Sequence, residues 1–380
     1  MSSLKSHVGL VALGALLVIL VISVMFSLPV MLTLLLMLVV GVVAAAQANG
    51  SYVWRKLLGL IPILLAVTFT TFLLTSLLPG DPAVNILGTS ATPEAVAELH
   101  VRLHLDDPLI SRYGRWLGSA VTGDLGTSPF TNKPVAGALS KALPKSLLLM
   151  AYAQIYALGL AIPLGVWAAY KEGGRVDRGM TALSSVALST PTYVLAPLLV
   201  LFFSVGGLNW FHKQLGFHIL PATVPSSSYK SLLDDPFRHF KNHLLPVIAV
   251  GTTQAAAYLR LLRSDMIGTL KEDFISVAKA KGMTTRRVLL SHALRPSSFT
   301  LLTVLGVNIG FLIGNSLIVE QVFSMPNLGG AIATAVFQRD YLTVQGAVVA
   351  IAVVYVFANF AVDLIYAVLD PRVRHARAIV

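Results

Sequence analysis

Few residues in this 380-residue chain are of a type and spacing that do covalent chemistry. The chain has no Cys, which excludes disulfides, thiolate catalysis and Cys-ligated metal, and its nine His show no H-E-x-x-H spacing for another metal site. No G-x-x-x-x-G-K-[ST] phosphate loop occurs, so we expect no ATP site of that kind. The polar residues that stand out are Asp363, Asn308, Asn315 and a basic stretch from Thr269 to Pro296.

The elements that position these residues are predicted to be transmembrane helices. The chain is 56% hydrophobic and 12% charged, against about 25% charged in a soluble domain. Apolar runs of about 20 residues, enough to cross a hydrocarbon layer roughly 30 Å thick, predict an all-α polytopic membrane protein. The eight predicted spans are 8–27, 29–46, 57–78, 146–169, 180–205, 244–262, 298–318 and 342–368. Despite the formal charge of +11, no basic face with interleaved aromatics occurs, so nucleic acid is not an expected partner.

The distribution of charge predicts that both termini lie in the cytoplasm. An even number of spans puts both ends on one side, and the cytoplasmic placement puts 17 of the 28 Lys and Arg inside. The long segment 79–145 has six basic and six acidic residues and is then external. The segment 263–297 is a cytoplasmic loop.

Residues 1–50 are predicted to form a retained hairpin of two transmembrane helices. The apolar run 8–46, broken near Pro29, is longer than the roughly 7–15 residues of a signal-peptide core. A cleaved signal is the alternative interpretation of the small-residue stretch 44–48. The hairpin is either a plain membrane anchor or a contact for an accessory subunit.

The cytoplasmic loop is predicted to contain a first short helix that a glycine ends. Thr269-Leu270-Lys271-Glu272 matches a capping box that follows an interruption at Gly268. The helix that starts there would carry Phe274, Ile275 and Ala278 on one face. Gly282 would end it, because glycine adopts the left-handed conformation at little cost.

A second short helix is expected to begin at Thr284 or Thr285 and to end near Arg295, because Pro296 follows. Arg286 and Arg287 fall in its first turn, where the helix dipole disfavours cations. We therefore expect these two residues to meet acidic or carbonyl groups of a partner. The alternative is that both helices lie on the membrane, with their basic residues facing lipid phosphates.

The sequence of this loop resembles the EAA loop, the signature of ABC-importer permeases. The matching residues are Asp273-Phe274-Ile275-x-x-Ala278-Lys279-Ala280-Lys281-Gly282 and, ten residues later, His292-Ala293-Leu294-Arg295-Pro296. In that family the loop docks into a groove on the ATPase subunit. The resemblance assigns ATPase coupling to Asp273, Ala278, Ala280, Gly282, Arg286, Arg287, His292 and Pro296.

Four further patterns resemble the dipeptide/oligopeptide (peptide/nickel class) permease family. They are Leu78-Pro79-Gly80-Asp81-Pro82, Gly123-Asp124-Leu125-Gly126-x-Ser128, Val319-Glu320-x-Val322-Phe323-Ser324-x-Pro326 and Asp363-x-x-Tyr366-x-x-x-Asp370-Pro371-Arg372. The resemblance covers about residues 51–380. The chain departs from it at Ser276, where the wider signature has Glu, and at Asn327, where Gly is usual and Asn tolerates a positive φ.

The resemblance implies a six-helix type I importer permease domain over residues 51–380, with 1–50 as an extension. The chain would pair in a bacterial inner membrane with a second homologous permease, two cytoplasmic ATPases that bind ATP and Mg, and an external solute-binding protein. Membrane lipid surrounds it. Its cargo would be peptides or related small solutes, a class that includes nickel chelates and glutathione. It would not itself be an enzyme.

Polar and small residues within the spans have two interpretations each. Gly306, Gly310 and Gly314 repeat every fourth residue and favour close helix packing. Asn308 and Asn315 share another face, where they would line a substrate path or hydrogen-bond a neighbouring helix. Asp363 is expected to be a structural partner near the inner boundary, with a proton relay as the alternative.

Two other functional classes fit the sequence less well than an importer. An ion-gradient-driven secondary transporter needs intramembrane charges and often repeated halves, but only Asp363 and no clear repeat are present. An intramembrane enzyme needs a catalytic set inside the spans, and the sequence has none.

Overall fold

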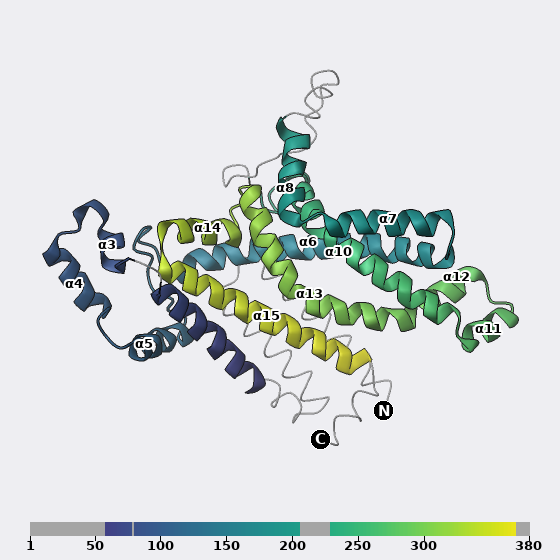
Figure 1. Ribbon diagram of the computed structural model, residues 1–380, viewed down its shortest axis with the longest axis horizontal. Coiled ribbons are helices and arrows are strands. Elements are labelled where there is room, and N and C mark those ends of the chain that lie inside the picture. Colours follow the sequence, from purple (N-terminus) through teal and green to yellow (C-terminus); the bar gives the residue numbers. More distant parts are fainter. Residues whose placement is uncertain (1–57, 78–79, 206–228, 370–380) are drawn as a thin grey trace. The chain divides into compact units, whose positions relative to one another are not determined.

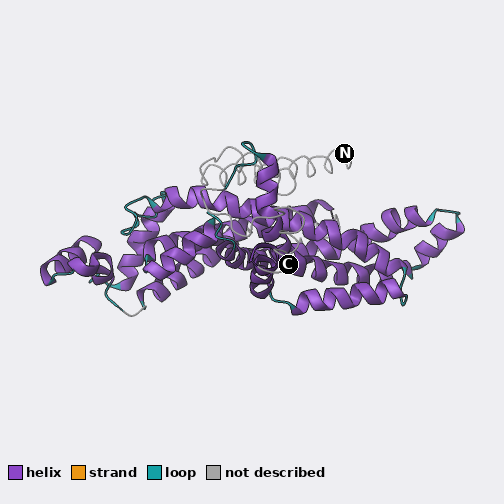
Figure 2. Ribbon diagram, turned by 90° about the horizontal axis from the view of Figure 1, so that it is seen from above, coloured by secondary structure: helices purple, strands orange, loops and turns teal. Residues whose placement is uncertain are grey.

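The computed structural model describes residues 58–77, 80–205 and 229–369, most of them in helices (Figure 1). The first two predicted spans, 8–27 and 29–46, lie outside these residues. The described part of the chain has no β-strand; one isolated β-bridge joins Thr127 and Pro134 (Figure 2). The all-α prediction is confirmed.

Five helices in the described residues are long and apolar enough to cross a membrane. They are Leu58–Ser76, α6 (Val135–Tyr170), α10 (Pro236–Leu270), a continuous helix Thr285–Val322 and α15 (Tyr341–Leu369). The continuous helix consists of α12 (Thr285–Arg287), η3 (Val288–Ala293) and α13 (Leu294–Val322). These five helices confirm all but one of the spans predicted after residue 50.

The remaining predicted span, 180–205, is bent. Its two halves, α7 (Arg175–Ser189) and α8 (Thr192–Val200), meet at 93°, and η2 (Leu201–Val205) extends the second half. Pro191 disfavours the helical conformation at the residue before it, and Thr190 is extended (φ −95°, ψ 105°). If the bent pair counts as one span, the described residues contain six.

The chain divides into two compact units. One holds the described residues up to Lys145 and from Gly330 onward, and the other is Ser146–Gly329. In the first unit the predicted 79–145 segment forms four short helices before α6 begins. They are α3 (Pro82–Leu87), η1 (Gly88–Ser90), α4 (Pro93–Leu103) and α5 (Leu109–Val121).

Tyr113 of α5 attaches this helix to Leu58–Ser76. Its hydroxyl lies 2.8 Å from Thr68 Oγ1, and its ring meets Phe69 and Phe72 edge-on. The second unit is built on α6, α10 and α13, whose small residues allow close approach. Ala157, Ala161, Ala255 and Leu301 surround the fully buried Tyr258 there.

Candidate functional site

Gly282 ends α11 (Asp273–Ala280) in the predicted left-handed conformation, with φ at 75°. Its N–H donates to the Lys279 carbonyl at 2.9 Å, and Met283 N–H donates to the Ala278 carbonyl at 3.3 Å. These bonds satisfy carbonyls that the helix end leaves open. Thr284 is then extended (φ −63°, ψ 146°) and α12 begins at Thr285, so the order helix, glycine turn, helix is confirmed.

The predicted capping box at Thr269 is wrong. Helix α10 passes through Gly268 to Leu270, and Thr269 lies in its last turn with its carbonyl accepting from Glu272 N–H at 3.2 Å. Glu272 itself precedes α11 and makes no side-chain capping bond. The packing of Met266 in the core favours continuation of α10 over the local preference of glycine, since tertiary contacts outweigh helix propensity.

The predicted helix stop before Pro296 is also wrong, because the helix Thr285–Val322 continues through this residue. A proline has no N–H for the i→i−4 bond and breaks or kinks an ordinary helix. The turn just before it, Val288–Ala293, is π-helical. Such a turn shifts the hydrogen-bond register, so the helix accommodates the missing donor.

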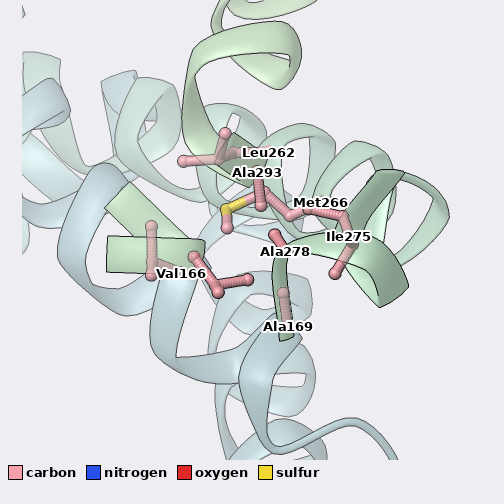
Figure 3. Close-up of a cluster of buried hydrophobic side chains, with 8 residues drawn as sticks. Val166, Ala169, Leu262, Met266, Ile275, Ala278 and Ala293 are labelled. Atoms are coloured by element: carbon pink, nitrogen blue, oxygen red, sulfur yellow. The ribbon is translucent and has the colours of Figure 1, made fainter. Parts of the chain in front are cut away.

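An apolar core fixes the segment that begins with α11 and ends in the first turn of α13, here called the coupling segment (residues 273–296). Side chains from the ends of α6 and α10 enclose Ile275 and Ala278 of α11 (Figure 3). The full cluster is Val166, Ala169, Leu262, Met266, Ile275, Ala278, Val288 and Ala293. The coupling segment therefore packs on the ends of two spanning helices.

The opposite side of the coupling segment is exposed. Phe274 and Val277 are 46% and 53% exposed, so the prediction that Phe274 shares a face with Ile275 and Ala278 is wrong. Phe274 and Val277 lie one and two positions from Ile275, which on a helix rotates their side chains away from it by about a quarter and a half of a turn. The other exposed candidates are Asp273, Ala280, Gly282, Arg286, Arg287 and Pro296, and His292 is half-buried.

Two ion pairs join the C-terminal part of α10, including Lys271 just after it, to the α6–α7 connection and the first turn of α7. Arg263 donates to both carboxylate oxygens of Asp177, and Lys271 Nζ lies 2.9 Å from Glu172 Oε1. Asp177 Oδ2 also accepts from Gly173 N–H at 2.9 Å. Sequence reasoning missed these pairs; the available signal was that all four residues fall in segments predicted to lie on the cytoplasmic side.

The predicted intramembrane residues occupy α13. Asn308 and Asn315 are half-buried, and the Asn308 side chain hydrogen-bonds the Tyr258 hydroxyl, which also accepts from Gln154 Nε2 at 3.1 Å. Gly306 is buried and Gly310 half-buried. Gly314 is exposed and has no neighbour within 4 Å of a Cβ placed there. Asp363 lies in α15, and its side chain is outside the described residues.

Residues in or next to two of the sequence patterns form hydrogen bonds with residues far along the chain in the first unit. Ser128 Oγ donates to Asp340 Oδ2 at 2.5 Å, and Thr343 Oγ1 donates to the same oxygen at 2.7 Å. Asn85, just after Pro82, accepts from Arg339 Nη1 at 3.4 Å. The two patterns therefore fix the turn that joins α14 (Leu328–Gln338) to α15.

Asp81 also meets His100, whose two ring nitrogens lie 2.8 Å from Asp81 and 2.9 Å from Asp106. Burial raises the pKa of Asp81, but the hydrogen bonds from His100 and from Ala83 N–H outweigh it and hold this pKa below its usual value. The hydrogen bonds to Asp106 and then to Asp81 raise the pKa of His100. The imidazole thus favours the charged form that bonds both carboxylates.

Glu320, from another of the patterns, organises the turn between α13 and α14 in the second unit. Its Oε2 accepts from Ser146 Oγ at 2.9 Å and from Gly329 N–H at 2.7 Å, and the side chain is fully buried. A Cβ at Gly329 would collide with the Leu317 backbone. Asn327 is buried without adopting a positive φ, which Ser324 adopts instead at 53°.

Comparison with known proteins gives the family. Residues 161–375 match the binding-protein-dependent transport system inner membrane component, and residues 50–149 match the N-terminal part of such a membrane component. The chain belongs to this family, and it is a multi-pass permease subunit of an ABC importer.

Three relatives align over nearly their whole lengths. A putative peptide transport system permease protein of Brucella abortus is 36% identical over 83% of this chain and 96% of its own. The dipeptide transport system permease protein DppB of Alkalihalophilus pseudofirmus is 34% identical over 86% and 99%. The oligopeptide transport system permease protein AppB of Bacillus subtilis is 33% identical over 86% and 100%.

Proposed function

We propose that this chain forms, with a second homologous permease, the path by which an ATP-driven importer takes up peptides or related small solutes. A solute-binding protein delivers the solute from outside. Two cytoplasmic ATPases bind ATP and Mg²⁺ and supply the energy, so the chain itself needs no cofactor. The names of the relatives support peptides as the cargo.

The proposal places the chain in a bacterial inner membrane with both termini and the coupling segment in the cytoplasm. The 17 Lys and Arg on that side support this orientation. The helical segment 79–145 then faces outward, where a solute-binding protein docks. Asn308 and Asn315 remain candidates for lining the path, although the bond from Asn308 to Tyr258 gives it a structural partner already.

The observation that carries the proposal is the two-sided coupling segment. Its inner side, with Ile275 and Ala278, is packed against α6 and α10, so a force applied to it reaches two spanning helices directly. Its outer side combines the exposed Phe274 and Val277 with the exposed Arg286 and Arg287. Apolar and arginine side chains together are characteristic of a protein-binding surface.

The experiment is uptake by a reconstituted complex. The chain, tagged at its C-terminus, is extracted gently, its co-purifying subunits are identified, and the complex is placed in proteoliposomes with a radiolabelled dipeptide outside. We expect two ATPase subunits and a second permease, and uptake that requires both ATP inside and the binding protein outside. Uptake by the chain alone that an ionophore abolishes would instead favour the ion-gradient-driven alternative.

A further inference from the structure

The pair Asp177–Arg263 differs from the other ion pairs of the described residues in its burial. The Asp177 side chain is 5% exposed and Arg263 is 27% exposed, and the guanidinium meets both carboxylate oxygens. Loss of either partner would leave the other charge without its hydrogen-bonded counter-ion, at a position that is largely buried for Asp177. Two parallel bonds also fix the relative orientation of the two side chains.

Asp177 is held in place from its own helix as well. It lies in the first turn of α7, where the helix dipole favours a negative charge, and it accepts from Gly173 N–H in the preceding turn. The carboxylate therefore has one fixed position. Arg263 must come to it, and any movement of this part of α10 is transmitted to the start of α7.

The two residues belong to helices that differ in their contact with the coupling segment. Arg263 lies two turns before the end of α10, beside Leu262 and Met266, which contact the coupling segment. Helix α7 contributes no side chain to that described core, yet it begins the bent span α7–α8. The ion pair is thus a direct side-chain link from the body that carries the coupling segment to the bent span.

We propose that Asp177 and Arg263 are positioning residues that make the bent span α7–α8 follow the coupling segment when the ATPases move it. This inference rests on the proposed function. It assigns to a pair outside the docking surface the task of spreading the motion from α6 and α10 to a third span.

A neighbouring pair provides a matched control. Glu172 and Lys271 join the same two segments at 2.9 Å, but they are 47% and 64% exposed. An exposed pair contributes little, because water screens it and both side chains lose freedom. Neutralising Glu172 and Lys271 should therefore leave coupling unchanged, whereas neutralising Asp177 or Arg263 should not.

The test uses the complete reconstituted complex with radiolabelled dipeptide and measures dipeptide imported per ATP hydrolysed. The variants are Asp177→Asn, Arg263→Gln, the reversed pair Asp177→Arg/Arg263→Asp and the control Glu172→Gln/Lys271→Gln. We expect normal ATPase retention in all of them, and a fall of about tenfold in import per ATP for the two single variants, within the usual range of coupling between sites. The reversed pair should recover only part of it, because an arginine at position 177 cannot accept from Gly173 N–H and opposes the dipole of α7, and the control should match wild type.

A purely structural role would lower the amount of complex without changing import per ATP. That result, or single variants that import as efficiently as wild type, would overturn the inference and leave the proposed function intact. Failure of the reversed pair to recover any coupling would also count against it. If the wild-type complex itself imports without consuming ATP, the proposed function fails, and this inference fails with it.

Discussion

The turn at Gly282 needs a residue that tolerates a φ of 75°, and the space around its Cβ position is open. A substitution there acts through backbone conformation alone. Gly282→Val should raise the free energy of the left-handed turn by at least about 1–2 kcal/mol. We expect the turn to change its conformation, which would displace α12 and Arg286 from α11. We expect normal insertion but weak ATPase retention, measured by co-purification.

Gly268→Val is the control for this variant. Gly268 lies inside α10 and also has nothing within 4 Å of its Cβ position, but its φ is not positive. The Gly268→Val variant should retain the ATPase as the wild type does. Equal retention by the Gly282 and Gly268 variants would show that the turn conformation is not needed for docking.

His100 is expected to give the segment α3–α4 a pH-dependent stability. Because the pKa of His100 is raised, its contribution is complete below the ordinary histidine pKa and is lost as pH rises through the raised value. The pKa of Asp81 is lowered, so its contribution is lost as pH falls through that lowered value. Hydrogen-exchange protection of α3–α4 should therefore be highest at pH values between the lowered pKa of Asp81 and the raised pKa of His100.

The variant His100→Gln tests this dependence. A glutamine keeps one hydrogen bond but does not titrate, so the loss of protection on the alkaline side should disappear. The same alkaline loss in His100→Gln and in wild type, after correction for intrinsic exchange, would refute the assignment to His100.

At the scale of elements, the turn between α13 and α14 requires a glycine at position 329, because the Leu317 backbone leaves no space for a side chain there. Gly329→Ala would press a methyl group against the Leu317 backbone, and overpacking of this kind costs about 1–3 kcal/mol. We expect a lower Tm for the isolated chain in detergent. Gly314→Ala meets no neighbour and should not lower the Tm; equal Tm values for the two variants would contradict the crowding at Gly329.

The elements that the sequence predicted correctly are those with strong local signals. Long apolar runs identified the spans, and Gly282 identified its turn. The wrong predictions were helix ends, at Thr269 and before Pro296. In the first case core packing outweighed glycine, and in the second a π-helical turn accommodated proline. The bend within the predicted span 180–205, at Pro191, was not predicted.

The site was predictable to a similar extent. The residues of the coupling segment were identified, but the face that Phe274 occupies was not, because Phe is apolar whether it packs in a core or in an interface. Contacts such as Ser128 with Asp340 and Asp177 with Arg263 join residues far apart in sequence. No local pattern specifies them without knowledge of how the helices pack.

At the scale of the whole molecule, orientation in the membrane is the first expectation to test. The Cys-free chain permits single labels at Ser119 and Ser276, both of which are exposed. An impermeant thiol reagent added to intact cells should label Ser119→Cys and not Ser276→Cys. The reverse pattern would overturn the proposed topology, since insertion follows the positive residues.

Binding of an ATPase by the coupling segment is the central expectation for this protein. The direct measurement is ATPase retention and ATP-driven dipeptide uptake by Arg286→Glu/Arg287→Glu, compared with Lys171→Glu/Arg175→Glu, which makes the same charge change at exposed residues of the α6–α7 connection. Breaking one buried, hydrogen-bonded charge pair in a protein interface costs about 2–5 kcal/mol, so the first variant should reach the membrane, lose the ATPase and not import. The Lys171→Glu/Arg175→Glu variant should retain the ATPase and import the dipeptide. Wild-type retention and uptake by Arg286→Glu/Arg287→Glu would contradict the claim and return the segment to a helix pair at the membrane surface.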